Sequence, residues 1–157
     1  TFTIRPETMA SAVITGCKAK YSYTGKQVKP LIQVVWNGKI LRNNTDYTLL
    51  YKNNKKRGSA GIVVTGKGNY SSTLTASFTI VRASVKKASV TGLKAVYART
   101  GKAVKPKVTV KLGGKKLKKK RDYILSYRKN KKKGTALLYV KGVGNYSGTK
   151  KMKFKIR

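Results

Sequence analysis

Histidine is absent from the 157 residues, cysteine occurs once, and acidic residues occur only as Glu7, Asp46 and Asp122. A single cysteine excludes an intrachain disulfide. Without histidine the chain cannot assemble a Ser-His-Asp triad, and two widely separated aspartates form neither the carboxylate pair of a glycosidase nor a zinc or calcium shell. We therefore predict no catalytic residues, no metal site and no cofactor, so the chain is not expected to be an enzyme.

Long apolar runs are also missing. No stretch approaches the roughly 20 apolar residues that span a bilayer, so we predict no membrane insertion. The first nine residues, TFTIRPETM, lack the apolar middle region of a signal peptide. We expect the sequence to be a piece of a longer protein, so this absence does not place it in the cytoplasm.

Positive charge is what the chain has in excess. Lysine and arginine number 38 against three acids, which gives a formal net charge of +35. Hydrophobic residues make up 39% of the chain, and the regular spacing of Val, Ile, Tyr and Phe argues against disorder. A folded chain with this much self-repulsion is expected to bind counterions or a polyanion.

The sequence repeats itself without a gap at an offset of 76 residues. The octet GKGNYSST at 66–73 returns as GVGNYSGT at 142–149, and about half of the paired positions are identical. This predicts two modules, at 10–81 and 86–157. At the same offset Phe2 and Ile4 match Phe78 and Ile80, so residues 1–5 are predicted to be the tail strand of a preceding repeat in the same parent chain.

Each module has the two-residue period of strands. In MKFKI (152–156) the apolar and lysine residues alternate, and Asn37-Gly38 and Gly113-Gly114 suit two-residue hairpins. Six or seven short strands in about 70 residues predict an all-β fold of two tandem immunoglobulin-like β-sandwich modules. The link at 81–87 has neither glycine nor proline, so a rod-like arrangement is expected.

The order of these motifs resembles a family of bacterial immunoglobulin-like repeats, similar to the "mostly bacterial Ig" group. The motifs are Tyr-x-Gly or Thr-Gly, Val-x-Pro, an Asn-Gly turn, Asp-Tyr, Tyr-x-Asn-Asn, Gly-x-Ala, Gly-x-Gly-Asn-Tyr and a closing Phe-x-Ile. The resemblance covers both modules and is most specific in the Gly-x-Gly-Asn-Tyr element. It implies an extracellular location at the cell surface or cell wall of Gram-positive bacteria, in a stalk, adhesion or ligand-binding role without catalytic residues.

Several residues in repeated positions invite a functional interpretation beside a structural one. Asp46 and Asp122 could assist an intramolecular Lys–Asn crosslink, but a turn carboxylate that accepts backbone N–H groups is the favoured interpretation. Asn69 and Asn145 could form a ligand platform, but a left-handed turn residue before a packed tyrosine is favoured. Cys17 aligns with Leu93 and is interpreted as a small core residue.

The lysines are shared unequally between the modules. Residues 10–81 hold 11 Lys and Arg and residues 86–157 hold 25, with Arg5 and Arg82 outside both. Thr75, Ser77 and Thr79 are replaced by lysines in the second module, so the fold itself does not require these charges. The predicted polyanion-binding residues are Lys115, Lys116, Lys118, Lys119, Lys120, Arg121, Lys131, Lys132, Lys133, Lys151, Lys153 and Lys155.

These observations predict a non-catalytic stalk or adhesion segment whose lysine-rich face binds an acidic polymer. Teichoic acid, a glycosaminoglycan and an acidic mucin glycan all fit, and nonspecific binding of nucleic acid is expected at low salt. Two alternatives stay open. The modules could be targeting repeats of a secreted enzyme whose catalytic domain lies outside this sequence, or a self-assembling fibre that grows by strand addition.

Overall fold

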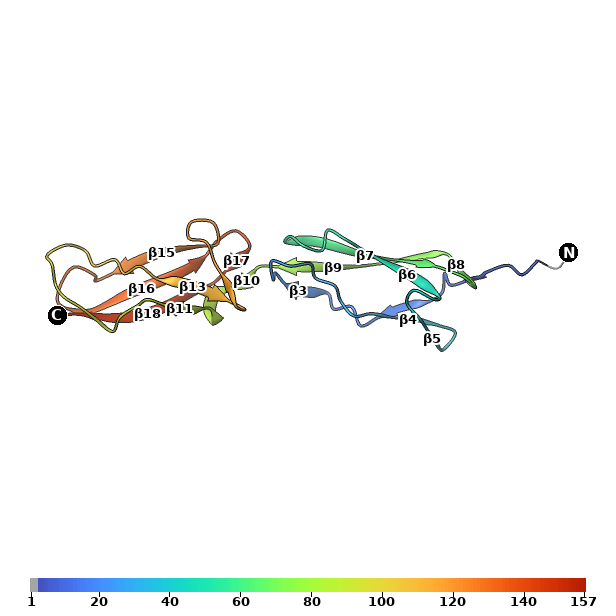
Figure 1. Cartoon of the computed structure of the whole chain (residues 1–157), viewed down its shortest axis with the longest axis horizontal. Coiled ribbons are helices and arrows are strands. Elements are labelled where there is room, and N and C mark those ends of the chain that lie inside the picture. Colours follow the sequence, from blue (N-terminus) through green and yellow to red (C-terminus); the bar gives the residue numbers. More distant parts are fainter. Residues whose placement is uncertain (1–2) are drawn as a thin grey trace. The chain divides into compact units, whose positions relative to one another are not determined.

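The computed structural model describes residues 3–157, and within them it is all-β with no α-helix. The chain divides into two compact units, a first unit up to Val81 and a second unit Arg82–Arg157 (Figure 1). Each unit contains a three-stranded and a four-stranded sheet, a β-sandwich-like arrangement. Phe2 lies outside the described residues, and residues 3–6 belong to no strand. That residues 1–5 end a preceding repeat stays a prediction.

The first unit contains nine short strands among its described residues. Strands β2, β4 and β5 form one sheet in that order, β3, β9, β7 and β6 form the other, and β1 pairs with β8. Their bounds are β1 Glu7–Thr8, β2 Val13–Thr15, β3 Lys20–Ser22, β4 Gln33–Trp36, β5 Lys39–Leu41, β6 Tyr47–Lys52, β7 Gly58–Gly66, β8 Tyr70–Ser71 and β9 Thr73–Val81.

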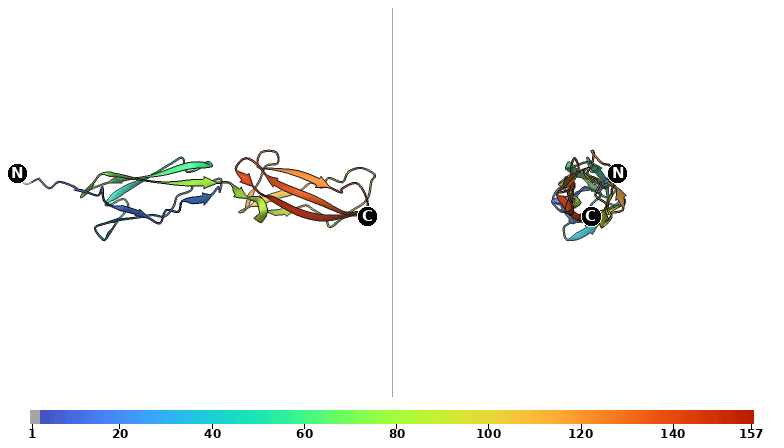
Figure 2. Two further views of the ribbon diagram at one scale, coloured as in Figure 1. Left: turned by 180° about the vertical axis from the view of Figure 1, so that it is seen from behind. Right: turned by 90° about the vertical axis from the view of Figure 1, so that its left-hand side faces the viewer.

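The second unit repeats this arrangement. Its sheets have the orders β11-β13-β14 and β12-β18-β16-β15, with β10 paired to β17 (Figure 2, left, shows the sheets from behind). The bounds are β10 Ala83–Ser84, the 3-10 turn η1 Val85–Lys87, β11 Ser89–Thr91, β12 Val96–Tyr97, β13 Thr109–Leu112, β14 Lys115–Lys116, β15 Tyr123–Arg128, β16 Gly134–Gly142, β17 Tyr146–Ser147 and β18 Thr149–Ile156.

Strand β18 has one neighbour of each orientation. It runs antiparallel to β16 and parallel to β12 on its other side, where Val96 pairs with Lys155. The predicted alternation along β18 is confirmed. Phe154 and Ile156 are buried, Met152 packs against them, and Lys151, Lys153 and Lys155 are exposed.

The turn chemistry is confirmed at the hairpins and corrected at the repeated octets. Asn37, Gly38, Gly113 and Gly114 all have positive φ, as two-residue hairpins require. In the octets, however, Asn69 and Asn145 do not adopt the predicted left-handed conformation. Gly68 (φ 65°) and Gly144 (φ 62°) take that conformation instead, because each precedes the asparagine at the turn and has no Cβ to clash.

The unit limits differ from the predicted module limits at both N-terminal ends. The second unit starts at Arg82 rather than at residue 86, because β10 pairs with β17 and Val85 is fully buried. Likewise β1 pairs with β8, and Met9 is fully buried in the core of the first unit. Strands of two residues are too short to show an alternating pattern, so they could not be predicted from the sequence.

The other repeated motifs fix the long loop that precedes β4 in the first unit and β13 in the second. The hydroxyl of Tyr51 donates to the Pro30 carbonyl at 2.7 Å, and Tyr127 makes the same bond to Pro106. The amide of Asn54 donates to the Val28 carbonyl at 2.9 Å. Cys17 is partly buried against the core of the first unit, which confirms its structural interpretation.

Candidate polyanion-binding surface

The structure distributes the twelve predicted cations over three parts of the second unit. Lys115 and Lys116 form β14, and residues 118–121 form the loop that leads into β15. Lys131, Lys132 and Lys133 lie in the loop between β15 and β16, at the other end of β15. Lys151, Lys153 and Lys155 line the exposed face of β18. The predicted residues therefore come from different elements of the second unit, and each part is described in turn.

The outer face of β18 continues onto its neighbour β16. Lys151 lies directly opposite Tyr139, and Lys153 lies opposite Leu137. From β15, the Arg128 guanidinium lies 5.7 Å from the centre of the Tyr139 ring, within cation–π range. Arg128 and Tyr139 were not among the predicted residues. The signal for Tyr139 was that it stands at the position of Val63, so it is not one of the repeated tyrosines.

The hairpin of β13 and β14 brings two lysines into direct opposition. Lys111 pairs with Lys116 across the strands, where the first unit pairs Val35 with Ile40. Like charges directly opposite each other destabilise an antiparallel pair, whereas two branched apolar residues stabilise it. The second unit therefore carries a charge pair that its own fold disfavours.

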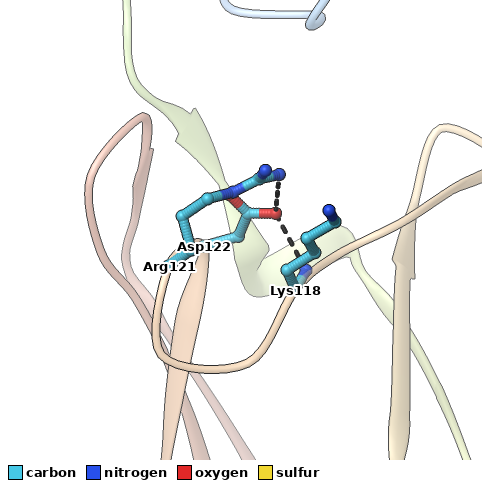
Figure 3. A network of polar contacts seen from close by, with 3 residues as sticks. All are labelled: Lys118, Arg121 and Asp122. Atoms are coloured by element: carbon cyan, nitrogen blue, oxygen red, sulfur yellow. Dashed lines mark hydrogen bonds and ion pairs between the residues drawn. The ribbon is translucent and has the colours of Figure 1, made fainter.

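The loop before β15 is held together by Asp122 (Figure 3). Its Oδ2 atom accepts the backbone N–H of Lys118 at 2.8 Å, and Arg121 donates to both carboxylate oxygens at 2.9 Å. Asp46 accepts the backbone N–H of Arg42 in the same way. These bonds confirm the turn-stabilising interpretation of the two aspartates. Arg121 is thus engaged with Asp122, although 59% of its side chain is exposed.

The same contacts change the acidity of Asp122. The hydrogen bonds from the Arg121 side chain and then from the Lys118 backbone lower the pKa of this carboxyl below its ordinary value, against an opposing effect of burial. A folded-state pKa below the unfolded-state value contributes stability that is present above the unfolded pKa and is lost as the pH falls.

We expect Asp122→Asn to destabilise the second unit by about 1–2 kcal/mol at neutral pH, because it removes a buried charged acceptor. The difference from wild type should shrink as the pH falls below about 4, where the aspartate of the unfolded wild-type chain becomes protonated, and should be lost as the pH falls through the lowered pKa of folded Asp122. Amide hydrogen exchange of the second unit at several pH values measures this difference in stability. Asp46→Asn is the control and should cost less, since Thr45 replaces Arg121 there. A pH-independent difference at Asp122 would contradict the explanation.

Two lysines occupy backbone conformations that disfavour them. Lys120 has φ 72° and Lys129 has φ 55°. The matching residues of the first unit, Asn44 and Asn53, have φ 68° and 53°. Asparagine tolerates the left-handed region better than lysine, whose Cβ clashes there without local compensation. At both positions the second unit has lysine where the first unit has asparagine, which this backbone conformation favours.

We expect Lys120→Asn and Lys129→Asn each to stabilise the second unit by about 0.5–1 kcal/mol, because asparagine is less strained at positive φ. Thermal unfolding followed by amide NMR of the second unit is the measurement. The matched control is Lys119→Asn, which removes one charge from the same loop without changing a left-handed residue. Equal stabilisation by the control would attribute the gain to reduced repulsion rather than to the backbone.

The lysine triplet in the loop between β15 and β16 does not distinguish the units. Lys131, Lys132 and Lys133 occupy the positions of Lys55, Lys56 and Arg57 in the first unit. Both triplets are exposed and border an open depression at the same place in each unit. Among the predicted residues, those of the β14 region and of β18 therefore distinguish the second unit from the first.

Within residues 3–157, no three His, Cys, Asp or Glu side chains form a group that could hold a metal ion. None of the helical segments in this range is both long and apolar enough to cross a bilayer. No family model matches the chain, and neither a curated protein nor a solved structure is significantly similar to it.

Proposed function

We propose that the chain is a non-catalytic segment of a bacterial surface protein, built of two immunoglobulin-like modules, and that its second unit binds acidic polymers. The proposal of immunoglobulin-like modules rests on the sandwich-like sheets of each unit and on the motifs that both units share. A stalk or adhesion role outside the cell follows from the resemblance to bacterial repeats described above.

The placement of the extra cations is the observation that carries the binding proposal. Lys111 faces Lys116 across a hairpin, Lys120 and Lys129 take left-handed conformations, and β18 presents lysines at every second position. The first two arrangements disfavour the fold relative to the residues of the first unit, and the third gathers like charges along one exposed strand face. Solubility alone would be served by charges at unstrained positions, so a binding role explains the arrangement better.

The predominance of lysine over arginine favours ligands that are bound through their density of negative charge. Lysine accounts for 30 of the 38 basic residues, and its ammonium group acts as a point charge without the planar geometry of arginine. Exposed lysines along β18 recur about every 6.6–7 Å, which suits a linear polyanion that releases counterions on binding. Teichoic acid, glycosaminoglycans and acidic mucin glycans meet this description, and nucleic acid would bind nonspecifically at low salt.

The test compares two variants of the 157-residue chain that lose the same number of charges. The reverted variant gives the second unit the first unit's residues at six positions: Lys107→Leu, Lys116→Ile, Lys119→Asn, Lys151→Thr, Lys153→Ser and Lys155→Thr. The first-unit variant replaces six exposed lysines by serine: Lys18, Lys20, Lys26, Lys52, Lys55 and Lys56. Binding to immobilised heparin or teichoic acid should fall much more in the reverted variant. Equal losses would refute a binding role specific to the second unit.

A further inference from the structure

The second unit contains a groove at one open edge of its sandwich. The edge lies between β14, the last strand of the three-stranded sheet, and β15, the last strand of the four-stranded sheet. Residues 105–109 and 116–119 form one side, and β15 contributes Tyr123, Leu125 and Tyr127. The cavity volume is about 910 Å³, within the range of sites that hold small ligands.

The rim and the floor of this groove differ in chemistry. Five lysines line it, and none of the described lining residues is acidic. The rest of the lining is almost entirely apolar or aromatic, and the Tyr127 hydroxyl is already bonded to the Pro106 carbonyl. Tyr127 therefore presents its ring rather than a free hydroxyl. The rim lysines are Lys105, Lys107, Lys116, Lys118 and Lys119, and the apolar lining is Pro106, Val108, Leu117, Tyr123, Leu125 and Tyr127.

Comparison with the first unit shows which part of the groove is specific. The floor residues at the matching positions are the same or similar, for example Pro30, Leu49 and Tyr51. The rim is not conserved between the units. Leu31, Ile40 and Asn43 stand where the second unit has Lys107, Lys116 and Lys119, and Leu31 and Ile40 are 94% and 57% exposed. Three cations have thus been added around a floor that both units share.

We propose that this groove holds a short stretch of an acidic polysaccharide, with sugar rings against the apolar floor and carboxylate or sulfate groups on the lysine rim. The inference rests on the proposed function and narrows its ligand to a polymer that contains rings. A pyranose ring has apolar C–H faces and a polar edge, which matches an apolar floor beneath a cationic rim. A ring-free polyphosphate gains nothing from the floor and would contact the exposed lysines of the rim and of β18 alike.

The groove and the face of β18 provide a pair of variants with equal charge loss. The groove variant is Lys107→Leu, Lys116→Ile and Lys119→Asn, and the β18 variant is Lys151→Thr, Lys153→Ser and Lys155→Thr. Each introduces residues that the first unit carries at the same positions of its own fold. Both are made in the full chain, and circular dichroism and thermal unfolding check that they fold.

The probes are polygalacturonate, which carries one carboxylate on each sugar ring, and inorganic polyphosphate, which has no rings. The groove variant should lose about 10-fold or more in affinity for polygalacturonate, and the β18 variant about 3-fold or less. Polyphosphate affinity should fall by similar factors in both. In wild type, polygalacturonate but not polyphosphate should shift the methyl NMR resonances of Val108 and Leu125.

The outcomes separate this inference from the proposed function. Equal loss of polygalacturonate affinity in the two variants, or unshifted Val108 and Leu125 methyl groups at saturation, would overturn the groove inference and leave the charge-based proposal standing. Failure of wild type to bind either polymer at low salt would overturn both. A larger loss in the groove variant for both polymers would also overturn the inference, because it would assign the groove to anions in general.

Discussion

Raising the salt concentration from 50 to 200 mM is expected to weaken heparin binding by the wild-type chain by roughly 300- to 1,000-fold. Each lysine that contacts the polymer releases a counterion and contributes about 0.7–0.9 to the slope of log affinity against log salt. Six contacts from the groove and β18 therefore give a slope of roughly −4 to −5. Titration by isothermal calorimetry or surface plasmon resonance at several salt concentrations measures it.

The reverted variant should differ from wild type in both affinity and slope. Removal of the six contacts should flatten the slope by roughly 4 and abolish most of the affinity at low salt. The first-unit variant has the same net charge and is the control, since it should keep a slope close to that of wild type. If the two variants showed equal slopes, the affinity would follow net charge rather than the placement of the lysines.

Sequence reasoning succeeded where the physical cause is local. The alternation in residues 152–156 fixes which side chains of β18 are buried, because successive side chains of a strand point to opposite faces. The Asn37-Gly38 and Gly113-Gly114 turns follow from the need for positive φ. The turn role of Asp46 and Asp122 follows from their short acceptor side chains, and the hydrogen bonds agree with it.

The remaining features depend on contacts between distant segments. Met9 enters the core only because β1 pairs with β8, more than 60 residues further on. The groove requires residues 105–109 and 116–119 to face β15, and the Arg128–Tyr139 contact requires β15 to lie beside β16. Within the octet, sequence reasoning placed the left-handed conformation on asparagine, whereas the turn assigns it to the preceding glycine. Residue type alone cannot choose between two neighbours that both tolerate it.

The first glycine of each octet allows two strands to approach closely, and the substitution Gly66→Ala tests this role. A Cβ atom on Gly66 would lie 2.8 Å from the Tyr70 carbonyl oxygen and 2.9 Å from the Ser71 carbonyl carbon, both backbone atoms of β8. Gly142 meets the backbone of β17 in the same way, 2.7 Å from the Ser147 nitrogen. Unlike the tip of a flexible side chain, paired backbone cannot move aside without breaking hydrogen bonds, including the bond from the Gly66 N–H to the Ser72 carbonyl.

We expect Gly66→Ala to lower the free energy of unfolding of the first unit by about 2–3 kcal/mol, and its melting temperature by roughly 10–20 °C. Trp36 is the single tryptophan of the chain and its ring lies 5.5 Å from the Tyr70 ring, so its fluorescence follows the unfolding of this unit.

Gly61→Ala in the same strand is the matched control. Its Cβ would have no neighbour closer than 3.9 Å, and the second unit already has Leu137 there. The control should be neutral or slightly stabilising, because alanine restricts the unfolded chain. Equal destabilisation by both substitutions would attribute the loss to strand propensity and not to the close approach of β7 and β8.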